Sequence, residues 1–235
     1  MKSGSHCFIS SNLGRGLKAG KFNTTFPLWR NAWRGVAVLS LAVLLAAGNV
    51  ASGAAKADRS PGQTPKLFAK LPDACPTPDG MAIAPDGDLV VACPNYADQT
   101  KPACLLKIGK NRKVRVWVNV PVLPATGVAC PMGIEFGPDG DLYVCDNQGW
   151  KGDPKGQFQG RILRLRIKED KVESCTVVAE GMEHPNGVRV RDGHLYVTQS
   201  MMTKVKDASG LIVSGVYRFK LDDKQVKVTN TREDA

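Results

Sequence analysis

Pro78-Asp-Gly-Met-Ala-Ile-Ala-Pro-Asp-Gly-Asp-Leu-Val-Val-Ala92 is the first of three related stretches in this sequence. The other two are Pro131-Met-Gly-Ile-Glu-Phe-Gly-Pro-Asp-Gly-Asp-Leu-Tyr-Val-Cys145 and Pro185-Asn-Gly-Val-Arg-Val-Arg-Asp-Gly-His-Leu-Tyr-Val-Thr198. All three begin with Pro-x-Gly and pass through an Asp-Gly turn into a second apolar run. Their leading glycines, Gly80, Gly133 and Gly187, are 53 and 54 residues apart. A fixed period of this size indicates a repeat architecture.

Each repeat is predicted to contain four short strands. In the first repeat, an Asp-Gly turn between two apolar runs indicates a hairpin, because glycine tolerates positive φ. A second hairpin follows it across Gly109–Lys113. Four strands in each period are typical of a β-propeller blade. The predicted strands are Met81–Ala84, Leu89–Cys93, Leu105–Ile108 and Val114–Val118, then Arg161–Ile167 and Val172–Val178, then Gly215–Lys220 and Gln225–Thr229.

The predicted fold is therefore all-β, with three to four four-stranded antiparallel blades over residues 75–235. Residues 58–74 are predicted to be a linker in which Lys66–Ala69 forms the outer strand of a preceding blade. Propellers typically have 4 to 8 blades, so this set is short of a ring. The interpretation favoured from sequence is a propeller truncated at the C-terminus, and the alternative is that three blades pair with another chain.

Residues 1–57 resemble a secretory signal with a long basic n-region. Arg30 and Arg34 precede an uncharged apolar run that starts at Gly35, and Ala55-Lys56-Ala57 fits a small-x-small cleavage site. The alternative is an uncleaved membrane anchor over residues 35–55, although its second half is weakly apolar. The expected location is exported, either periplasmic or extracellular, and a membrane is involved only if the leader is retained.

Charge is concentrated in this leader. The chain has a net charge of +10, but residues 1–57 hold seven basic and no acidic side chains. The other 178 residues carry 25 basic and 22 acidic side chains, a net of +3. Such a balanced body has no electrostatic footprint for phosphate backbones, so no nucleic-acid partner is expected.

Six cysteines follow the leader, an even number that predicts disulfides in an exported domain. The best local pair is Cys93 with Cys104, because these two residues bracket one Pro-rich loop. Without a Cys-x-x-Cys motif, a zinc ribbon or a c-type haem is not supported. The six are Cys75, Cys93, Cys104, Cys130, Cys145 and Cys175.

Propeller geometry predicts a candidate site. The first strand of each blade lines the axis, so the residue before each leading glycine should meet its equivalents there. These residues are Asp79, Met132 and Asn186. Asp and Asn supply the oxygen ligands that a hard cation prefers, whereas the Met thioether is a poor ligand for Ca²⁺ or Mg²⁺.

The stretches Pro78–Cys93 and His184-Pro-Asn-Gly-Val188 resemble the gluconolactonase/regucalcin (senescence marker protein) family, over about residues 66–229. The resemblance implies a six-bladed propeller with one divalent cation, Ca²⁺, Mg²⁺, Mn²⁺ or Zn²⁺, on its axis. It also implies that Asn186 is a metal ligand, and that Asp79 is both a metal ligand and the catalytic base.

The order of the motifs departs from that family. There, the Pro-Asp-Gly aspartate comes one blade after the Pro-Asn-Gly asparagine, whereas here Asp79 precedes Asn186 by two blades. An alternative therefore treats Asp79 as a turn residue and places the catalytic aspartate one period beyond Asn186, past Ala235.

Three loops are expected on the same face as these residues: 94–102, 146–160 and 199–214. The second is long, rich in glycine and aromatic, and loops on a rigid scaffold often carry function. Asp146 and Asn147 begin this loop near the axis and are reserve oxygen ligands for the metal, and Trp150 and Phe158 are candidate floors of a substrate pocket.

Two functions follow from these features. The first is an exported, divalent-metal-dependent lactone or ester hydrolase, in which the cation polarises the carbonyl and a carboxylate takes a proton from water. The alternative is a non-catalytic propeller, similar to NHL repeats, that binds a ligand or protein partner on its loop face. Additional oxygen ligands on the axis would favour the enzyme, and apolar residues such as Met132 favour the binding module.

The cysteine count yields a first testable prediction. Thiol titration of the exported protein, denatured without reductant, should find fewer than six free thiols among the residues after the leader. Six free thiols would contradict the disulfide prediction and leave the leader as the sole indication of export.

Overall fold

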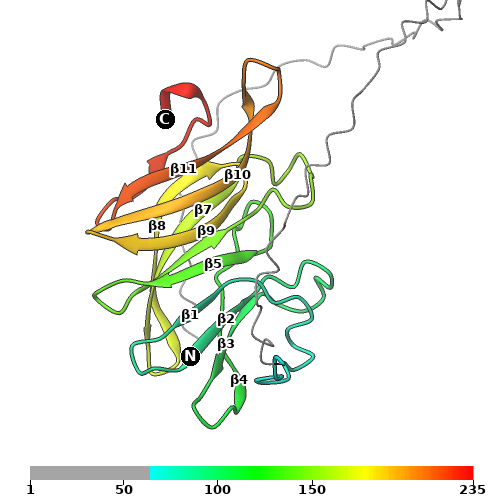
Figure 1. The fold of residues 1–235 in the computed structure, drawn as a ribbon, viewed down its shortest axis with the longest axis vertical. Helices are drawn as coiled ribbons and strands as arrows, with labels where there is room; N and C mark the ends of the chain where they lie inside the picture. The colour runs from blue at the N-terminus through cyan, green and yellow to red at the C-terminus, as the bar shows by residue number, and fades with distance from the viewer. Residues whose placement is uncertain (1–63, 235) are drawn as a thin grey trace, which may run out of the picture. The chain divides into compact units, whose positions relative to one another are not determined.

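The computed structural model describes residues 64–234, which contain twelve β-strands and one 3-10 helix at Arg232–Asp234. The strands form antiparallel blades, as Figure 1 shows. No helix among these residues is long and apolar enough to cross a membrane. The predicted leader and its alternative, a membrane anchor over residues 35–55, lie outside the described residues.

The first blade follows the predicted pattern closely. Its strands are β1 (Met81–Ile83), β2 (Leu89–Cys93), β3 (Cys104–Ile108) and β4 (Val114–Asn119), paired in that order. The turn between β1 and β2 has Gly87 at a φ of +85°. A residue with a side chain rarely adopts that backbone conformation. The turn therefore favours glycine at this position, which explains why the Asp-Gly pair predicts the hairpin.

The second and third blades repeat this arrangement. The second contains β5 (Pro131–Phe136), β6 (Leu142–Asp146), β7 (Gly160–Lys168) and β8 (Lys171–Met182). The third contains β9 (Pro185–Arg191), β10 (His194–Lys206) and β11 (Ile212–Lys220).

The last predicted strand has a different partner from the one expected. Gln225–Thr229 was predicted to be the fourth strand of the third blade, but β12 (Val226–Lys227) pairs in parallel with β8 of the second blade. Asn230 then anchors the chain, because its buried side chain accepts a hydrogen bond from Gln199 and donates one to the Gly181 carbonyl. An apolar pattern predicts a strand and does not identify its neighbour, so the third blade has three strands in place of four.

The segment before β1 also differs from the prediction. Residues 66–69 form no strand. Ala69, Leu71 and the buried Cys75 pack against the first blade, over a cluster that includes Val91 and Leu106. This segment therefore covers part of the sheet and does not extend another blade.

One disulfide holds that cover in place, and it is not the predicted one. Cys75 bonds to Cys93 with a Cα–Cα distance of 5.4 Å, whereas Cys104 is a buried free thiol. Cys93 and Cys104 are direct register partners on β2 and β3, as their bracketing of the loop suggested. The Cys93 sulfur nevertheless bonds to Cys75, which belongs to the segment that packs on the sheet.

Two apolar clusters join the blades. Ala82, Val90 and Leu105 of the first blade pack with Ile134 and Leu163 of the second. In the same way, the opposite face of the second blade packs against the third. That contact includes Met132, Tyr143, Cys145, Val188, Leu195 and Val197.

The leading glycines set how closely the blades approach. A Cβ atom built on Gly80 would lie 2.8 Å from the Gly133 Cα, and one built on Gly133 would lie 2.7 Å from the Gly187 Cα. Both positions face backbone that cannot move aside as a side chain can. In Figure 1, β1, β5 and β9 accordingly run side by side.

Alanine substitutions at these glycines test this packing. Gly133→Ala should lower the free energy of unfolding by about 3 kcal/mol or more, because overpacked backbone must shift. Gly187→Ala is the matched control. Its added methyl would meet a side-chain atom and not backbone, the Thr198 hydroxyl at 3.1 Å, which also accepts a hydrogen bond from the Gly187 N–H, so the loss should be about 1 kcal/mol. Equal losses in urea unfolding would contradict the close approach of the blades.

Candidate functional site

The three Pro-x-Gly stretches lie beside the segments that were predicted to be long loops. The prediction of a loop over 199–214 is wrong, because residues 199–206 continue β10 and residues 212–214 begin β11, so that only a short turn separates them. In each blade, a backbone hydrogen bond joins the start of the inner strand to the second strand at the point where the predicted loop begins. These bonds run from Asp79 N to Ala92 O, from Asn147 N to Cys130 O, and from Ser200 N to His184 O.

The three segments also contact one another. The rings of Tyr96 and Trp150 lie 5.2 Å apart between the first and second loops. Lys204, on β10, lies over the ring of Phe158, at 4.4 Å from its centroid. Trp150 also packs partly against the core. Trp150 therefore joins the first two loops, and Phe158 joins the second loop to β10.

A cavity of about 410 Å³ opens beside the inner strands. Asp79 and Asn186, which are two repeats apart in sequence, both line it. Met132 does not line it, because its side chain is buried in the cluster between the second and third blades. Of the three residues predicted to lie together on the axis, Asp79 and Asn186 therefore lie at the cavity and Met132 does not. The other lining residues are Gly80, Met81, Gly133, Ile134, Gly187, Val188, Arg189, Tyr196, Thr198 and Val216.

Asp79 is half-buried, and this burial raises the pKa of its carboxyl above the ordinary value, although a hydrogen bond from the Gly80 backbone acts in the opposite direction. The negative charge of Asp79 also affects a buried thiol in the neighbouring core. The pKa of the Cys130 thiol is raised first by burial and then by the charges of Asp146 and Asp79. A carboxylate with a raised pKa is a better proton acceptor than an ordinary surface aspartate.

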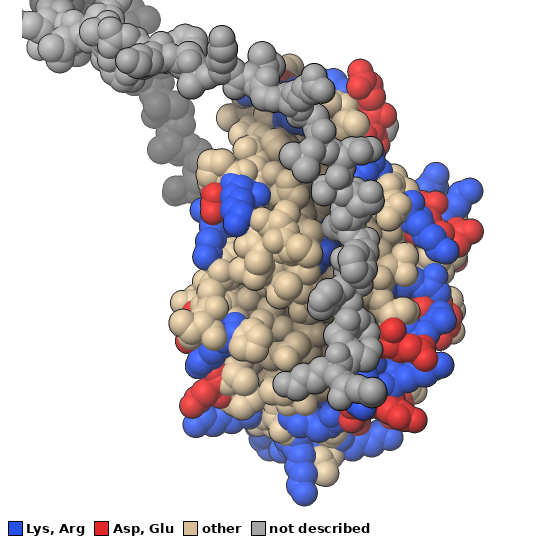
Figure 2. Space-filling view, turned by 180° about the vertical axis from the view of Figure 1, so that it is seen from behind, with Lys and Arg blue, Asp and Glu red and all other residues tan. Residues whose placement is uncertain are grey.

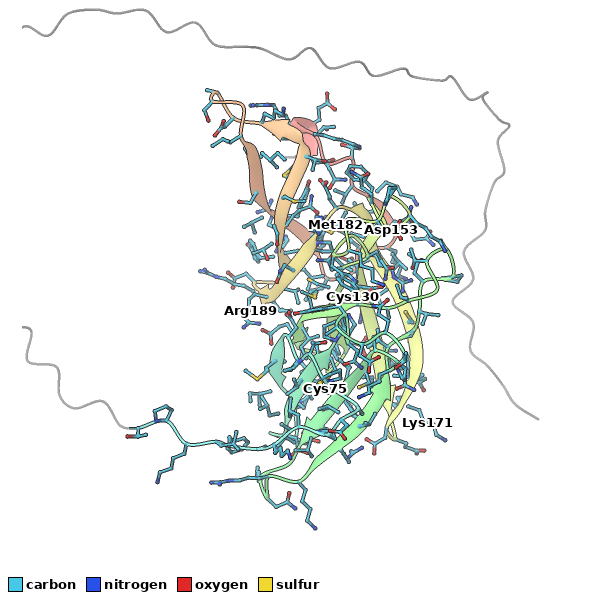
Figure 3. The ribbon with its side chains drawn as sticks, turned by 90° about the vertical axis from the view of Figure 1, so that its right-hand side faces the viewer. Cys75, Cys130, Asp153, Lys171, Met182 and Arg189 are labelled. Atoms are coloured by element: carbon cyan, nitrogen blue, oxygen red, sulfur yellow. A yellow bond between two sulfur atoms is a disulfide. The ribbon has the colours of Figure 1, made fainter. Side chains whose placement is uncertain are left out.

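Asn186 is partly buried and its side-chain amide makes no hydrogen bond to any residue in the 64–234 range. Its oxygen is therefore free to bind a ligand in the cavity. Arg189, two residues further along β9, is held by an ion pair with Glu135 at 3.0 Å. Figure 3 shows the Arg189 side chain extending away from the sheets, whereas Cys130 lies among the core side chains.

The side chains of Asp146 and Asn147 make structural contacts within the protein. Asp146 is fully buried, pairs with the buried Arg161 at 2.7 Å, and accepts a hydrogen bond from the Cys130 backbone. The Asn147 side chain is also buried and accepts a hydrogen bond from the Gly149 N–H at 3.1 Å. Neither residue lines the cavity.

The donor atoms at the cavity fit a hard cation in kind, since Asp79 and Asn186 both offer oxygen. They are few in number. Among residues 64–234 there is no group of three or more His, Cys, Asp or Glu side chains that could hold a metal ion. The set supplied by these three blades is therefore a partial one.

Sequence reasoning did not single out Arg189 and Tyr196, which also line the cavity. The repeat alignment carries a signal for both. Arg189 occupies the position of the buried Ala82 and the half-buried Glu135, and the half-buried Tyr196 occupies that of the buried Tyr143. Both side chains are thus more exposed than their equivalents in the earlier repeats.

No family model and no curated protein sequence matches this chain. Solved structures with a similar fold include an aldose sugar dehydrogenase from Streptomyces coelicolor in its PQQ-bound form, with 20% identity over 67% of this chain and 47% of that one, at a TM-score of 0.47. They also include a gluconolactonase from Xanthomonas campestris, with 14% identity over 68% of this chain and 52% of that one, at a TM-score of 0.41.

A third is a luciferin-regenerating enzyme, with 17% identity over 66% of this chain and 50% of that one, at a TM-score of 0.41. This chain spans about half the length of these three proteins. The similarity concerns the fold, which in these neighbours is a β-propeller.

The raised pKa of Asp79 predicts a pH-dependent cost to stability. Because the folded state holds this proton more tightly than the unfolded state, charged Asp79 destabilises the fold above its folded-state pKa, and the cost disappears below the ordinary value of 3.8. Asp79→Asn should therefore be more stable than wild type at about pH 7, with the difference lost near pH 3.

Urea unfolding at the two pH values measures this difference. Asp153→Asn, in an exposed loop where the side chain accepts a hydrogen bond from the Lys155 backbone, serves as the control and should follow the wild-type profile. A difference between Asp79→Asn and wild type that persists at pH 3 would show that charge is not its cause.

Proposed function

We propose that this protein is an exported, divalent-metal-dependent hydrolase of small lactones or esters, of the gluconolactonase type. The observation that carries the proposal is the convergence of Asp79 and Asn186 on one cavity of about 410 Å³ at the loop-bearing face. Small-molecule sites are commonly clefts of this size with a few polar groups.

Four of the lining residues have side chains suited to roles in acyl transfer. Asp79, with its raised pKa, accepts the proton of the attacking water. Asn186 contributes an amide oxygen, and Tyr196 with Arg189 offers hydrogen-bond donors that orient the substrate. A cation bound by Asp79 and Asn186 would polarise the carbonyl and lower the pKa of water.

The disulfide between Cys75 and Cys93 supports the proposed export, because disulfides persist in oxidising compartments. Figure 2 shows basic and acidic side chains mixed along the margins of one face, as expected from the near-balanced charge after residue 57.

A second candidate is a binding module of the NHL kind. It is favoured by the burial of Met132, which leaves the middle repeat without a ligand at the cavity. In that case Asp79 and Asn186 would recognise a polar group of the bound partner.

Calorimetric titration of Ca²⁺, Mg²⁺, Mn²⁺ and Zn²⁺ into the full chain, followed by assay of a lactone and ester panel with and without chelator, tests the proposal. Asn186→Ala should weaken metal binding, and Asp79→Ala should weaken it further because it also removes a charge. Loss of the base should lower kcat/KM by about 10² to 10⁴. Asp153→Ala removes an exposed loop carboxylate as the matched control and should have no effect.

The outcomes separate the two candidates. If wild type binds no divalent ion and hydrolyses no lactone, the binding module replaces the hydrolase. If Asp79→Ala binds metal as well as wild type while Asn186→Ala does not, Asp79 is a turn residue and the acidic ligand lies elsewhere.

A further inference from the structure

Three cysteine sulfurs lie in one buried cluster on the first blade. Cys75, Cys93 and Cys104 are all buried, and they pack together with Val91 and Leu106. Cys75 comes from the segment that covers the sheet, and Figure 3 shows it beside the strands of the first blade. The disulfide uses two of the three sulfurs, so the Cys104 thiol remains in the same cluster as the bond.

Cys93 has two neighbours to which the backbone lets it bond. It is joined to Cys75, and it is also the register partner of Cys104 across β2 and β3. Residues directly opposite each other on antiparallel strands have side chains on the same face and Cα atoms about 4.5 to 5.5 Å apart. Disulfides form across Cα distances of about 4.4 to 6.8 Å. A bond between Cys93 and Cys104 is therefore compatible with the same sheet.

The Cys104 side chain lies beside the covering segment and beside free volume. Its sulfur is 3.9 Å from the carbonyl oxygen of Ala74, the residue that precedes Cys75. It also lines a cavity of about 260 Å³ at the outer part of the first blade. The thiol is thus not packed on every side and has room to rotate towards Cys93. The other residues that line this cavity are Asp73, Ala74, Lys101, Pro102, Val116 and Asn119.

We propose that the bond between Cys75 and Cys93 exchanges with a bond between Cys93 and Cys104 in the folded protein. The Cys104 thiolate attacks the Cys93 sulfur, and the new S–S bond forms as the old one breaks. Cys75 leaves as a thiolate and takes up the proton that Cys104 has lost. One disulfide and one thiol are present before and after the step, so no oxidant or reductant is consumed.

The exchange moves a covalent constraint from one part of the first blade to another. The bond to Cys75 ties the covering segment to β2. The bond to Cys104 would instead join the two ends of the loop 94–102, because Cys93 directly precedes this loop and Cys104 follows it. In that state the covering segment is held by packing and hydrogen bonds, among them the bond from the Asn95 side chain to the Ala74 carbonyl at 2.9 Å.

Burial makes the exchange slow at neutral pH, because it raises the pKa of the Cys104 thiol and keeps it protonated. The charged residues at its cavity are Asp73 and Lys101. The Lys101 ammonium donates a hydrogen bond to the Asp73 backbone carbonyl at 2.5 Å and lies 3.7 Å from the Asp98 carboxylate. Since the thiolate is the attacking species, the rate should rise about tenfold for each pH unit below the pKa. This inference uses only the cysteine cluster and does not depend on the proposed hydrolase function.

Disulfide mapping of Cys75→Ser tests whether the second bond can form. The full chain with this substitution, produced in an oxidising compartment, should contain a disulfide between Cys93 and Cys104 in most molecules. Cleavage before Asp79 and before Asp98 places the three cysteines on separate peptides, which mass spectrometry identifies singly or as a linked pair. A folded variant in which Cys93 and Cys104 are both free to react with N-ethylmaleimide would overturn the proposal.

The exchange itself is followed in the wild-type chain, without added reductant. The oxidised protein is incubated at about pH 7.5 and about pH 8.5, quenched with acid, denatured, and labelled with N-ethylmaleimide. Label should appear on Cys75, about tenfold faster at the higher pH. Cys104→Ser should reduce the labelling of Cys75 at least about tenfold, because the attacking thiol is missing.

Cys130→Ser is the matched control, since it removes a buried free thiol that belongs to a different cluster. This variant should label Cys75 as the wild type does, and circular dichroism checks that both variants remain folded. Absence of label on Cys75 in the wild type at both pH values would overturn the proposal. Equal labelling of Cys75 in Cys104→Ser and wild type would overturn it as well, because another nucleophile would then open the bond.

Discussion

The spacing between neighbouring inner strands depends on a backbone contact that permits no side chain. Gly80 faces the backbone at Met132–Gly133, and Gly133 faces the backbone at Asn186–Gly187. Because neither peptide can retreat, glycine is required at both positions. This contact allows the apolar clusters behind it to close, since Ala82 and Ile134 reach one another only when β1 and β5 are adjacent. The leading glycines recur at intervals of 53 and 54 residues because each neighbouring pair of blades must meet this constraint.

The same constraint positions the candidate site. A residue directly before such a glycine has its backbone fixed beside the next strand, and its side chain is directed towards the open side or into the core. For Asp79 and Asn186 the side chain lines the cavity, and for Met132 it joins the core. The two polar residues, Asp79 and Asn186, are therefore brought together at the cavity, and the apolar Met132 is buried.

Much of the fold could be predicted because it is local. The Asp-Gly hairpins and the strand order of the first blade follow from turn chemistry and alternation, which act over a few residues. The partner of Val226 and the bond of Cys93 to Cys75 could not be predicted, because each depends on which distant surface lies nearby. Asp146 was predicted to begin a loop and to be a reserve ligand, because its buried partner Arg161 is brought to it only by the pairing of β6 and β7.

The bond between Cys75 and Cys93 has a consequence for how the protein can be produced. It joins residues only 18 apart, so the covering segment can be fixed as soon as the first blade has been made and its cysteines are oxidised. In a reducing cytoplasm that bond would not persist, and the segment over Leu106 and Ile108 would be held by packing alone. Release of the segment would expose a β-rich apolar sheet face, the kind of surface on which newly made chains aggregate. Formation of this disulfide is therefore expected to increase the soluble yield of the protein.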